Sequence, residues 1–239
     1  MNNSEHQLTR LVILFMGRSG STYLQESLNS HPNIFIQGEL LVGKTRERQL
    51  QDLEIVFNRI SGSNFRVIGI KTKFRDLDQP KKFAPFFQKM NTKVICLTRR
   101  NLVKRIISVM RAMELNQVTG DWNLYNKEER IGKITIDIEC FKRWLNHSEV
   151  EKEKLLNYVN NLRLPTLYLE YEDLLLKPTR TFEQIFQFIG VESQTLQANC
   201  IKHTRDNLRE EIENFDQLRS HYLNTPYEAM FDEVLLSIT

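Results

Sequence analysis

Four short runs of apolar and β-branched residues occur along the chain, and polar residues bound each of them. They are Leu11 to Met16, Arg66 to Ile70, Lys93 to Thr98 and Thr166 to Tyr171. Apolar runs this short, without polar alternation, are typical of strands that are covered on both faces of a sheet. The pattern therefore predicts four buried strands.

Segments with helical periodicity separate the four predicted strands. Ser21 to Ser30 has two leucines four residues apart and is stopped by a proline, and Asn101 is placed to cap a helix with an apolar face. Cys140 to Leu162 is a long amphipathic stretch, and Pro178 to Gly190 has proline at the start and glycine at the stop of a helix. Strands that alternate with helices predict the α/β class: a three-layer, P-loop-like fold with a central, mostly parallel sheet flanked by helices.

The first predicted strand leads through a loop rich in glycine and serine, "MGRSGST", directly into a helix. Gly17 and Gly20 let the backbone turn tightly, and the N–H groups at a helix start favour anions. Arg18 adds a fixed, planar charge. Three hydroxyl side chains are further donors: Ser19, Ser21 and Thr22. The pattern predicts a phosphate site, and the alternative is a serine-rich turn that only caps the helix.

This loop departs from the ATP- and GTP-binding loop, G-x-x-x-x-G-K-[ST]. Gly20 is followed by Ser21 instead of lysine, and Phe15 occupies the place of the first glycine. The strand that ends at Thr98 is followed by arginine, where P-loop enzymes have the aspartate that holds magnesium. These departures disfavour a nucleoside triphosphate as the ligand.

A second group of cations follows the third predicted strand, in "LTRRNLVKRIIS". Arg100 lies at the strand end, and Ser108 lies eight residues on, in the following helix. For Lys104 and Arg111 we expect a solvated basic helix face, as most charge clusters are. Ligands of parallel sheets bind beyond the carboxyl ends of the strands, so the two groups predict a ligand with two separate phosphates.

The bulk composition limits the partners. The chain has 239 residues, a net charge of +3 and no long basic run, which argues against nucleic acid as the main partner. Its three cysteines are odd in number and far apart, which favours a reducing, cytoplasmic setting over a disulfide framework. Cys200 and His203 have no second ligand pair near them in sequence, so no metal site is expected.

No apolar run is long enough to span a membrane, and no secretory signal pattern opens the chain. The first nine residues are polar. We expect a flexible tail over residues 1–9 and a single domain over residues 10–239, without repeats or a linker. The oligomeric state stays open.

Taken together, these motifs resemble those of the PAPS-dependent sulfotransferases, whose sulfuryl donor PAPS is 3'-phosphoadenosine 5'-phosphosulfate. "GRSGSTYL" is similar to their 5'-phosphosulfate loop, and "RRNLVKRIIS" to their 3'-phosphate signature, in which arginine and serine lie eight residues apart. "YLEYEDLLLKP" and "HPNIFIQGELL" are similar to two further segments of the family. Within the family, the chain resembles in particular the bacterial nodulation-factor sulfotransferases.

Two positions depart from the family's patterns. Leu102 stands where the 3'-phosphate signature usually has proline, which changes the expected helix start but keeps the spacing of Arg100 and Ser108. Glu39 is followed by Leu40, where the tyrosylprotein branch has two consecutive acids. The register of a base that is carried over from that branch is therefore open by one residue.

The resemblance implies transfer of a sulfuryl group from PAPS to an acceptor hydroxyl or amine, with adenosine 3',5'-bisphosphate as the product and without a metal. Lys71, at the end of the second predicted strand, is expected to contact the bridging oxygen and the moving sulfuryl group, and Arg18 to assist it. The donor-binding residues that we expect are Arg18, Ser19, Gly20, Ser21, Thr22, Arg100, Ser108, Lys202 and Arg209. For Lys202 and Arg209 the alternative is a solvated side chain.

An acceptor hydroxyl needs a general base. Glu39 is the first candidate and His31 the second. The alternatives are that Glu39 caps a later helix or pairs with Lys44 or Arg46, and that His31 is a structural cap at its helix end. Lys73 is expected at the surface or facing the acceptor.

The resemblance implies a carbohydrate or glycolipid acceptor, and another small molecule is equally open. Residues 114–134, with Trp122 and Tyr125, are expected to form part of the acceptor wall. Two other functions remain. A P-loop kinase of a small metabolite is disfavoured by the missing loop lysine, and a non-catalytic nucleotide-binding protein by the joint presence of the candidate residues.

Overall fold

The computed structural model of the chain describes residues 8–58, 65–120, 122, 132–195 and 205–235. The chain forms two compact units, the sheet unit (residues 1–98 and 153–199) and the α4 unit (residues 99–152 and 200–239). Among the described residues, no helix is both long enough and apolar enough to cross a membrane.

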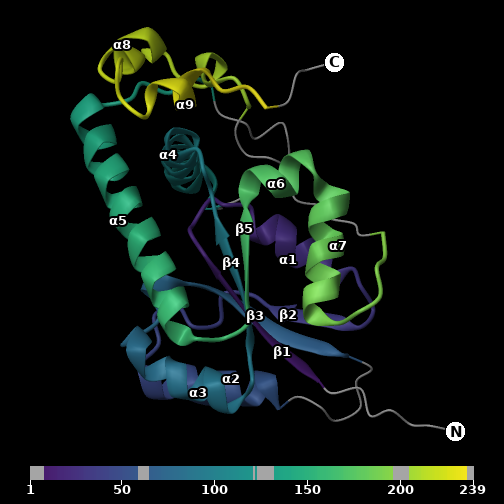
Figure 1. The fold of residues 1–239 in the computed structure, drawn as a ribbon. Coiled ribbons are helices and arrows are strands. Elements are labelled where there is room, and N and C mark those ends of the chain that lie inside the picture. The colour runs from purple at the N-terminus through teal and green to yellow at the C-terminus, as the bar shows by residue number, and fades with distance from the viewer. Residues whose placement is uncertain (1–7, 59–64, 121, 123–131, 196–204, 236–239) are drawn as a thin grey trace, which may run out of the picture. The chain divides into compact units, whose positions relative to one another are not determined.

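The sheet unit is built on five parallel strands in the order β2-β3-β1-β4-β5 (Figure 1). The strands are β1 (Thr9–Phe15), β2 (Ile34–Gln37), β3 (Val67–Lys73), β4 (Lys93–Thr98) and β5 (Thr166–Glu170). The predicted α/β fold with a parallel central sheet is confirmed, and all four predicted strands are present. The sequence does not predict β2, because four residues are too few to show a period.

Helices connect the strands of this unit. They are α1 (Ser21–Asn29), α2 (Arg46–Phe57), α3 (Ala84–Lys89), α6 (Tyr171–Leu176) and α7 (Pro178–Ile189), with two 3₁₀ turns, Phe74–Asp76 and Pro80–Phe83. α7 has the predicted proline at its start, and it ends at Gly190, which has a φ of 82°. The short helices α3 and α6 and the mainly polar α2 are absent from the prediction, because none of them has a strong apolar period.

Two helical layers cover the sheet. Figure 1 shows α1 and α7 on one side of it and α2 and α3 on the other. On the first side, Leu11, Ile13 and Phe15 of β1 form one cluster with the leucines of α1 and with Phe182 and Phe186 of α7. This buried cluster fixes α1 against the carboxyl half of β1, where the candidate loop begins.

The α4 unit is helical. It contains α4 (Leu102–Thr119), residues 138–152 of α5 (Ile138–Leu162), a 3₁₀ turn (Leu208–Glu210), α8 (Phe215–Ser220) and α9 (Glu228–Asp232). Asn101 caps α4 as predicted, since its side chain accepts a hydrogen bond from the backbone N–H of Lys104 at 2.8 Å. Aromatic rings from α5, α8 and α9 form the core of this unit, with Phe141, Phe215 and Phe231 all buried.

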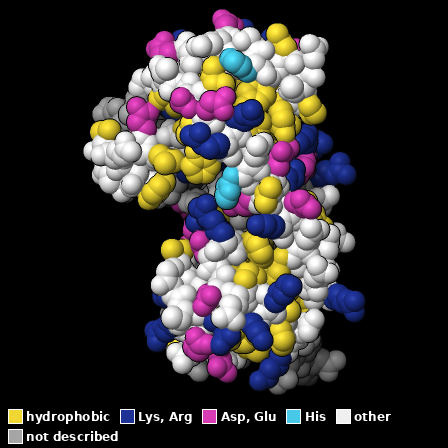
Figure 2. Space-filling model, turned by 90° about the vertical axis from the view of Figure 1, so that its left-hand side faces the viewer, with side chains coloured by type: hydrophobic (Ala, Val, Ile, Leu, Met, Phe, Trp, Pro, Cys, Tyr) yellow, Lys and Arg dark blue, Asp and Glu magenta, His cyan; other side chains and the backbone are white. Residues whose placement is uncertain are grey.

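The surface charge is mixed. Acidic and basic side chains are interspersed on the face of the molecule that Figure 2 draws. Ion pairs between such side chains include Arg219 with Asp232 and Arg209 with Asp216. The surface charge as a whole therefore does not indicate an anion site, and local groups of cations are the candidates.

Candidate active site

The candidate phosphate loop joins the end of β1 to the start of α1. Two of its residues have left-handed backbone conformations, Arg18 with a φ of 64° and Gly20 with a φ of 80°. For arginine this conformation costs about 1–2 kcal/mol, and such strain concentrates at ligand-binding sites. The loop is thus held in a shape that its sequence does not favour.

Ser19 shapes the loop from inside. Its side chain is fully buried, and its hydroxyl donates a hydrogen bond of 2.6 Å to the carbonyl oxygen of Met16. The hydroxyl proton therefore closes a turn within the loop. This differs from the expectation that the Ser19 hydroxyl is a donor to the ligand, because a donor with a buried carbonyl partner is already satisfied.

Glycine is required at position 20 for two reasons. A Cβ atom at this position would lie 2.8 Å from a ring carbon of Tyr171, the first residue of α6, and the positive φ disfavours any other residue. The ring of Tyr171 thus lies directly against the loop at the start of α1.

Two lysines of β3 lie on the same side of the sheet as α1. The parallel register places Lys71 beside Ile13 and Lys73 beside Phe15. Their ammonium nitrogens lie 5.7 and 5.6 Å from the centre of the Phe15 ring, within the range of cation–π attraction. β3 continues through Lys73, beyond the predicted end at Ile70, because it pairs with β1 up to Phe15.

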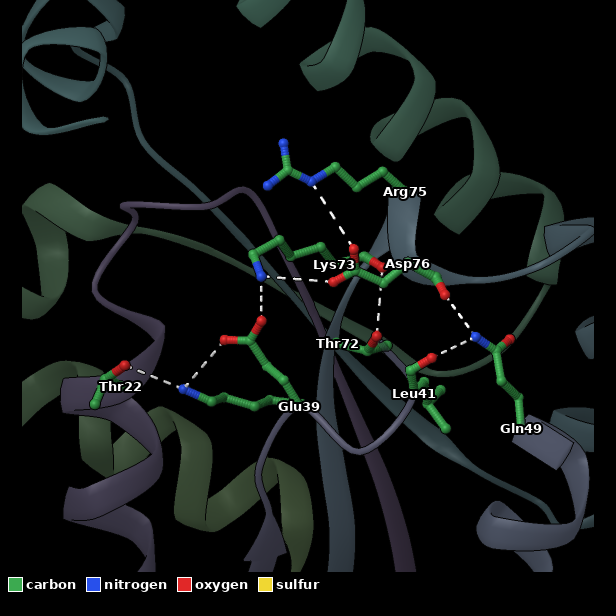
Figure 3. Close-up of polar contacts among 9 residues, drawn as sticks. Thr22, Glu39, Leu41, Gln49, Thr72, Lys73, Arg75 and Asp76 are labelled. Carbon is green, nitrogen blue, oxygen red and sulfur yellow. Dashed lines mark hydrogen bonds and ion pairs between the residues drawn. The ribbon is translucent and has the colours of Figure 1, made fainter. Parts of the chain in front are cut away.

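Lys71 is buried and points to the first turn of α1. Only 4% of its surface is exposed, and its Nζ donates a hydrogen bond of 3.1 Å to Oγ1 of Thr22 (Figure 3). The same Nζ lies 4.0 Å from Oε1 of Glu39. A buried ammonium group therefore lies at the helix start, where an anion is most favourable.

Glu39 reaches the same place from β2. It lies two residues after this strand, whose carboxyl end is at the same edge of the sheet as those of β1 and β3. Its carboxylate pairs with Lys73 as well as with Lys71 (Figure 3). The alternative partners form other contacts, Lys44 with Asp52 and Arg46 with Glu47.

Lys73 lies between two carboxylates. It pairs with Glu39, and its Nζ lies 3.5 Å from Oδ2 of Asp76. Only 18% of its side chain is exposed, so Lys73 belongs to the site and is not a surface residue. The two-residue period of a strand places Lys71 and Lys73 on one face. Asp76 lies in the 3₁₀ turn after β3, outside that period, and the sequence pattern does not point to it.

The structure places His31 apart from this group. His31 follows α1, at the end of that helix remote from the candidate loop. The backbone N–H of Asn33 donates to Nδ1 at 3.1 Å, so Nε2 carries the proton and donates to the carbonyl oxygen of Glu192, also at 3.1 Å. Both nitrogens are used in fixing the end of α1, which is the structural alternative, so His31 is withdrawn as a candidate base.

The candidate 3'-phosphate residues lie in the α4 unit. Arg100 is exposed in the turn before α4, and Ser108 is buried on the helix itself. The side chain of Asn101 holds the turn between them, since it caps α4 and also donates 2.8 and 2.7 Å hydrogen bonds to Met230 and Glu233.

The expected solvated basic face of α4 is wrong. Lys104 is 3% exposed and pairs with Asp206 at 3.1 Å, and Arg111 is 2% exposed with its Nε 2.9 Å from Oε2 of Glu211. The residues of the C-terminal segment cover this side of the helix, so its cations are buried in ion pairs. The sequence could not show this, because each partner is about 100 residues away along the chain.

The remaining candidates are less central. Arg209 is an exposed side chain that pairs with Asp216 and stacks on Phe215. Lys202 and Tyr125 lie outside the described residues, as do positions 121 and 123–131 of the expected acceptor wall. Residues 114–119 of that wall belong to the end of α4, and Trp122 is exposed.

Two further observations concern metal-binding and thiol side chains in the part of the chain that the structure describes. No group of three or more His, Cys, Asp or Glu side chains there could hold a metal ion. Burial raises the pKa of the Cys96 thiol to about 12, so this thiol is protonated at neutral pH and is a poor nucleophile.

The fold and the site define a class of protein. The parallel sheet, with a glycine- and serine-rich loop between its central strand and a helix, is that of an α/β protein of the P-loop-like kind. The sulfotransferase domain family matches residues 8–225. The chain belongs to this family and is a sulfotransferase.

The chain is also similar to individual proteins. Nodulation protein H of Rhizobium tropici is 25% identical over 236 residues, which cover 92% of each chain. Nodulation protein H of Rhizobium meliloti is 25% identical over 237 residues, 92% of this chain and 94% of the relative. Among solved structures, a sulfotransferase domain from the curacin biosynthetic pathway is 18% identical, with a TM-score of 0.49 over 79% of this chain and 76% of that one. A sulfotransferase from Alicyclobacillus acidocaldarius is 16% identical, with a TM-score of 0.48 over 94% and 96%.

Proposed function

We propose that the protein transfers a sulfuryl group from PAPS to a hydroxyl or amine of a carbohydrate, glycolipid or other small-molecule acceptor. The observation that carries this proposal is the buried Lys71, held at the first turn of α1 by Thr22 and next to the carboxylate of Glu39. The arrangement puts a cation for the leaving group beside a carboxylate for the acceptor.

The two phosphate groups of the donor have separate partners in the proposal. The loop from Arg18 to Thr22 holds the 5'-phosphosulfate through backbone N–H groups, the hydroxyls of Ser21 and Thr22 and the guanidinium of Arg18. Ser19 contributes through the shape of the loop. Arg100 and Ser108 hold the 3'-phosphate, and Arg209 and Lys202 remain further candidates for the nucleotide. No metal takes part.

The contacts of the two lysines support different roles for them. Lys73 is paired with two carboxylates, Glu39 and Asp76, and is therefore largely neutralised by them. Lys71 contacts the hydroxyl of Thr22, in the first turn of α1. We assign the bridging oxygen to Lys71 and the support of Glu39 to Lys73.

The proposed step is a single in-line displacement. The acceptor oxygen or nitrogen forms a bond to sulfur while the bond between sulfur and the bridging oxygen of the 5'-phosphate breaks. The acceptor proton passes to the carboxylate of Glu39, and the negative charge of the departing phosphate develops next to Lys71. A preorganised cation at that position is most effective in the transition state.

The experiment that tests the proposed donor is thermal unfolding with adenosine 3',5'-bisphosphate or with ATP and magnesium. A ligand that binds the folded state raises the melting temperature. The proposal expects stabilisation by the bisphosphate and none by ATP with magnesium. The reverse result would favour a P-loop kinase and contradict the proposal.

A further inference from the structure

Gln49 of α2 is a buried amide that joins two segments of the candidate site. It is 1% exposed. Its Nε2 donates hydrogen bonds of 2.6 Å to the carbonyl oxygens of both Leu41 and Asp76, and its Oε1 accepts a hydrogen bond of 2.9 Å from the backbone N–H of Asp78. One side chain thereby satisfies three backbone groups from two loops, and Figure 3 shows its contacts with Leu41 and Asp76.

The two loops carry the charged residues of the site. Leu41 lies two residues after Glu39, and Asp76 lies three residues after Lys73 and is also its ion-pair partner. Gln49 therefore fixes the backbone on both sides of the Glu39–Lys73 pair. It contacts neither side chain, so any influence on the pair passes through the two loops.

We propose that Gln49 is a positioning residue that sets the carboxylate of Glu39 relative to Lys71 and Lys73. The inference rests on the proposed function, since it assigns Gln49 to the same transfer step. It adds a residue on α2 to a site otherwise formed by the loop before α1, the first turn of α1, the end of β3 and the segments that follow β2 and β3.

The glutamine side chain matches the three backbone groups that it bonds. Two carbonyl oxygens need two donors and one backbone N–H needs an acceptor, and the glutamine side chain supplies both kinds of group without a charge. A lysine would add a cation to a site that already has two. A glutamate would direct a carboxylate at two carbonyl oxygens.

The composition of α2 supports the same conclusion. The inner face of this helix carries Gln49 and Asp52, both at most 5% exposed, next to the apolar Leu53 and Phe57. Burying polar groups is costly unless they are hydrogen-bonded. Asp52 pairs with Lys44 of the loop that follows Glu39, so two polar residues of α2 hold that loop.

The test is a kinetic comparison of Gln49→Met with the wild-type protein. Methionine keeps the length of the side chain and removes all three hydrogen bonds. A displacement of the base should lower kcat about 10- to 100-fold. The KM for PAPS and the affinity for adenosine 3',5'-bisphosphate should change by less than about threefold, because the phosphate loop is untouched. Gln88→Met is the matched control, since Gln88 also donates to a carbonyl, that of Leu162, but lies outside the site.

A double-mutant cycle with Glu39→Gln shows whether the effect passes through Glu39. The inference expects that Gln49→Met causes no further loss of kcat once Glu39 is glutamine. An equal loss in both backgrounds, or a Gln49→Met enzyme with wild-type kcat, would overturn the inference and leave the proposed function in place. Full turnover of Glu39→Gln alone would instead remove the proposed base, and the positioning role with it.

If the Gln49→Met protein does not fold, a second variant, Asp76→Asn, tests the same inference. Asp76→Asn keeps the backbone carbonyl that Gln49 holds and weakens the ion pairs of Asp76 with Lys73 and with the half-exposed Arg75. It should lower kcat in the same direction, with coupling to Glu39→Gln. A wild-type kcat for Asp76→Asn would show that the contact between Asp76 and Lys73 does not influence turnover, and it would contradict the inference.

Discussion

At the scale of single residues, the site is a set of charges whose partners define their roles. Lys71 and Lys73 lie two residues apart on one strand and contact the same aromatic ring. Lys71 is held by the hydroxyl of Thr22 and lies 4.0 Å from Glu39, whereas Lys73 pairs with both Glu39 and Asp76. The sequence identifies both lysines and Glu39, but their pairing depends on the register of β2, which leads to Glu39, against β3, which carries the lysines. That register is a tertiary property that no local pattern contains.

Replacing Lys71 by alanine should reduce turnover more than donor binding. The contact of Lys71 with the bridging oxygen strengthens as charge develops there, so kcat should fall about 10²- to 10³-fold with a smaller rise in the KM for PAPS. Steady-state kinetics against PAPS measure both. Lys82→Ala, an exposed lysine of the same unit, is the control. A sharp rise in KM at constant kcat would make Lys71 a ground-state ligand.

Replacing Arg100 by alanine should remove the preference for a 3'-phosphate. A charged hydrogen bond to phosphate contributes about 1.5–3 kcal/mol, so the variant should bind adenosine 3',5'-bisphosphate and the 5'-monophosphate with similar affinity. Calorimetric titration with both nucleotides measures this. Arg143→Ala, an exposed arginine of α5, should keep the wild-type preference. An unchanged preference in Arg100→Ala would exclude Arg100 from the site.

Replacing Gly20 by alanine should destabilise the protein more than the same change at Gly190. Both glycines have a positive φ, of 80° and 82°, so both substitutions incur the backbone cost of about 1–2 kcal/mol. Only at Gly20 does the new Cβ meet the ring of Tyr171, whereas it meets nothing within 4 Å at Gly190. Urea unfolding of the two variants measures the difference. Equal losses of unfolding free energy would show that the Tyr171 contact is not tight.

At the scale of elements, the apolar pattern predicts what is long and buried. The four predicted strands, the capped helix after Asn101 and the helix that ends at Gly190 are all present, because each has a strong apolar period or a specific end signal. The apolar pattern does not predict β2 and α2. These two elements position Glu39, which follows β2, and Gln49, which lies on α2. The elements with the weakest apolar signal thus position the polar chemistry.

In α4 the helix is predictable from the sequence, but the ion-pair partners of its cations are not. Residues far along the chain cover the basic side of this helix. Breaking the buried pair of Arg111 and Glu211 should cost about 3–5 kcal/mol, since it leaves one buried charge without its partner. Arg111→Met should lower the melting temperature accordingly, and adding Glu211→Met should restore part of the loss. A melting temperature of Arg111→Met equal to that of the wild type would contradict the buried pairing.

At the scale of the whole molecule, the family match covers residues 8–225, and the site residues of the sheet unit lie at the carboxyl ends of parallel strands, as the sequence predicts. The central claim is best tested at the donor and at the transferred group.

The most direct measurement follows the sulfuryl group itself. The protein is incubated with PAPS that carries radiolabelled sulfur, together with a panel of oligosaccharides, glycolipids and small alcohols and amines. The account predicts that label appears on at least one acceptor with release of adenosine 3',5'-bisphosphate, and that Glu39→Gln lowers this rate about 10²- to 10⁴-fold while nucleotide binding is kept. Label transfer that is as fast in Glu39→Gln as in the wild type would contradict the role of Glu39. Phosphoryl transfer from ATP in place of sulfuryl transfer from PAPS would contradict the account as a whole.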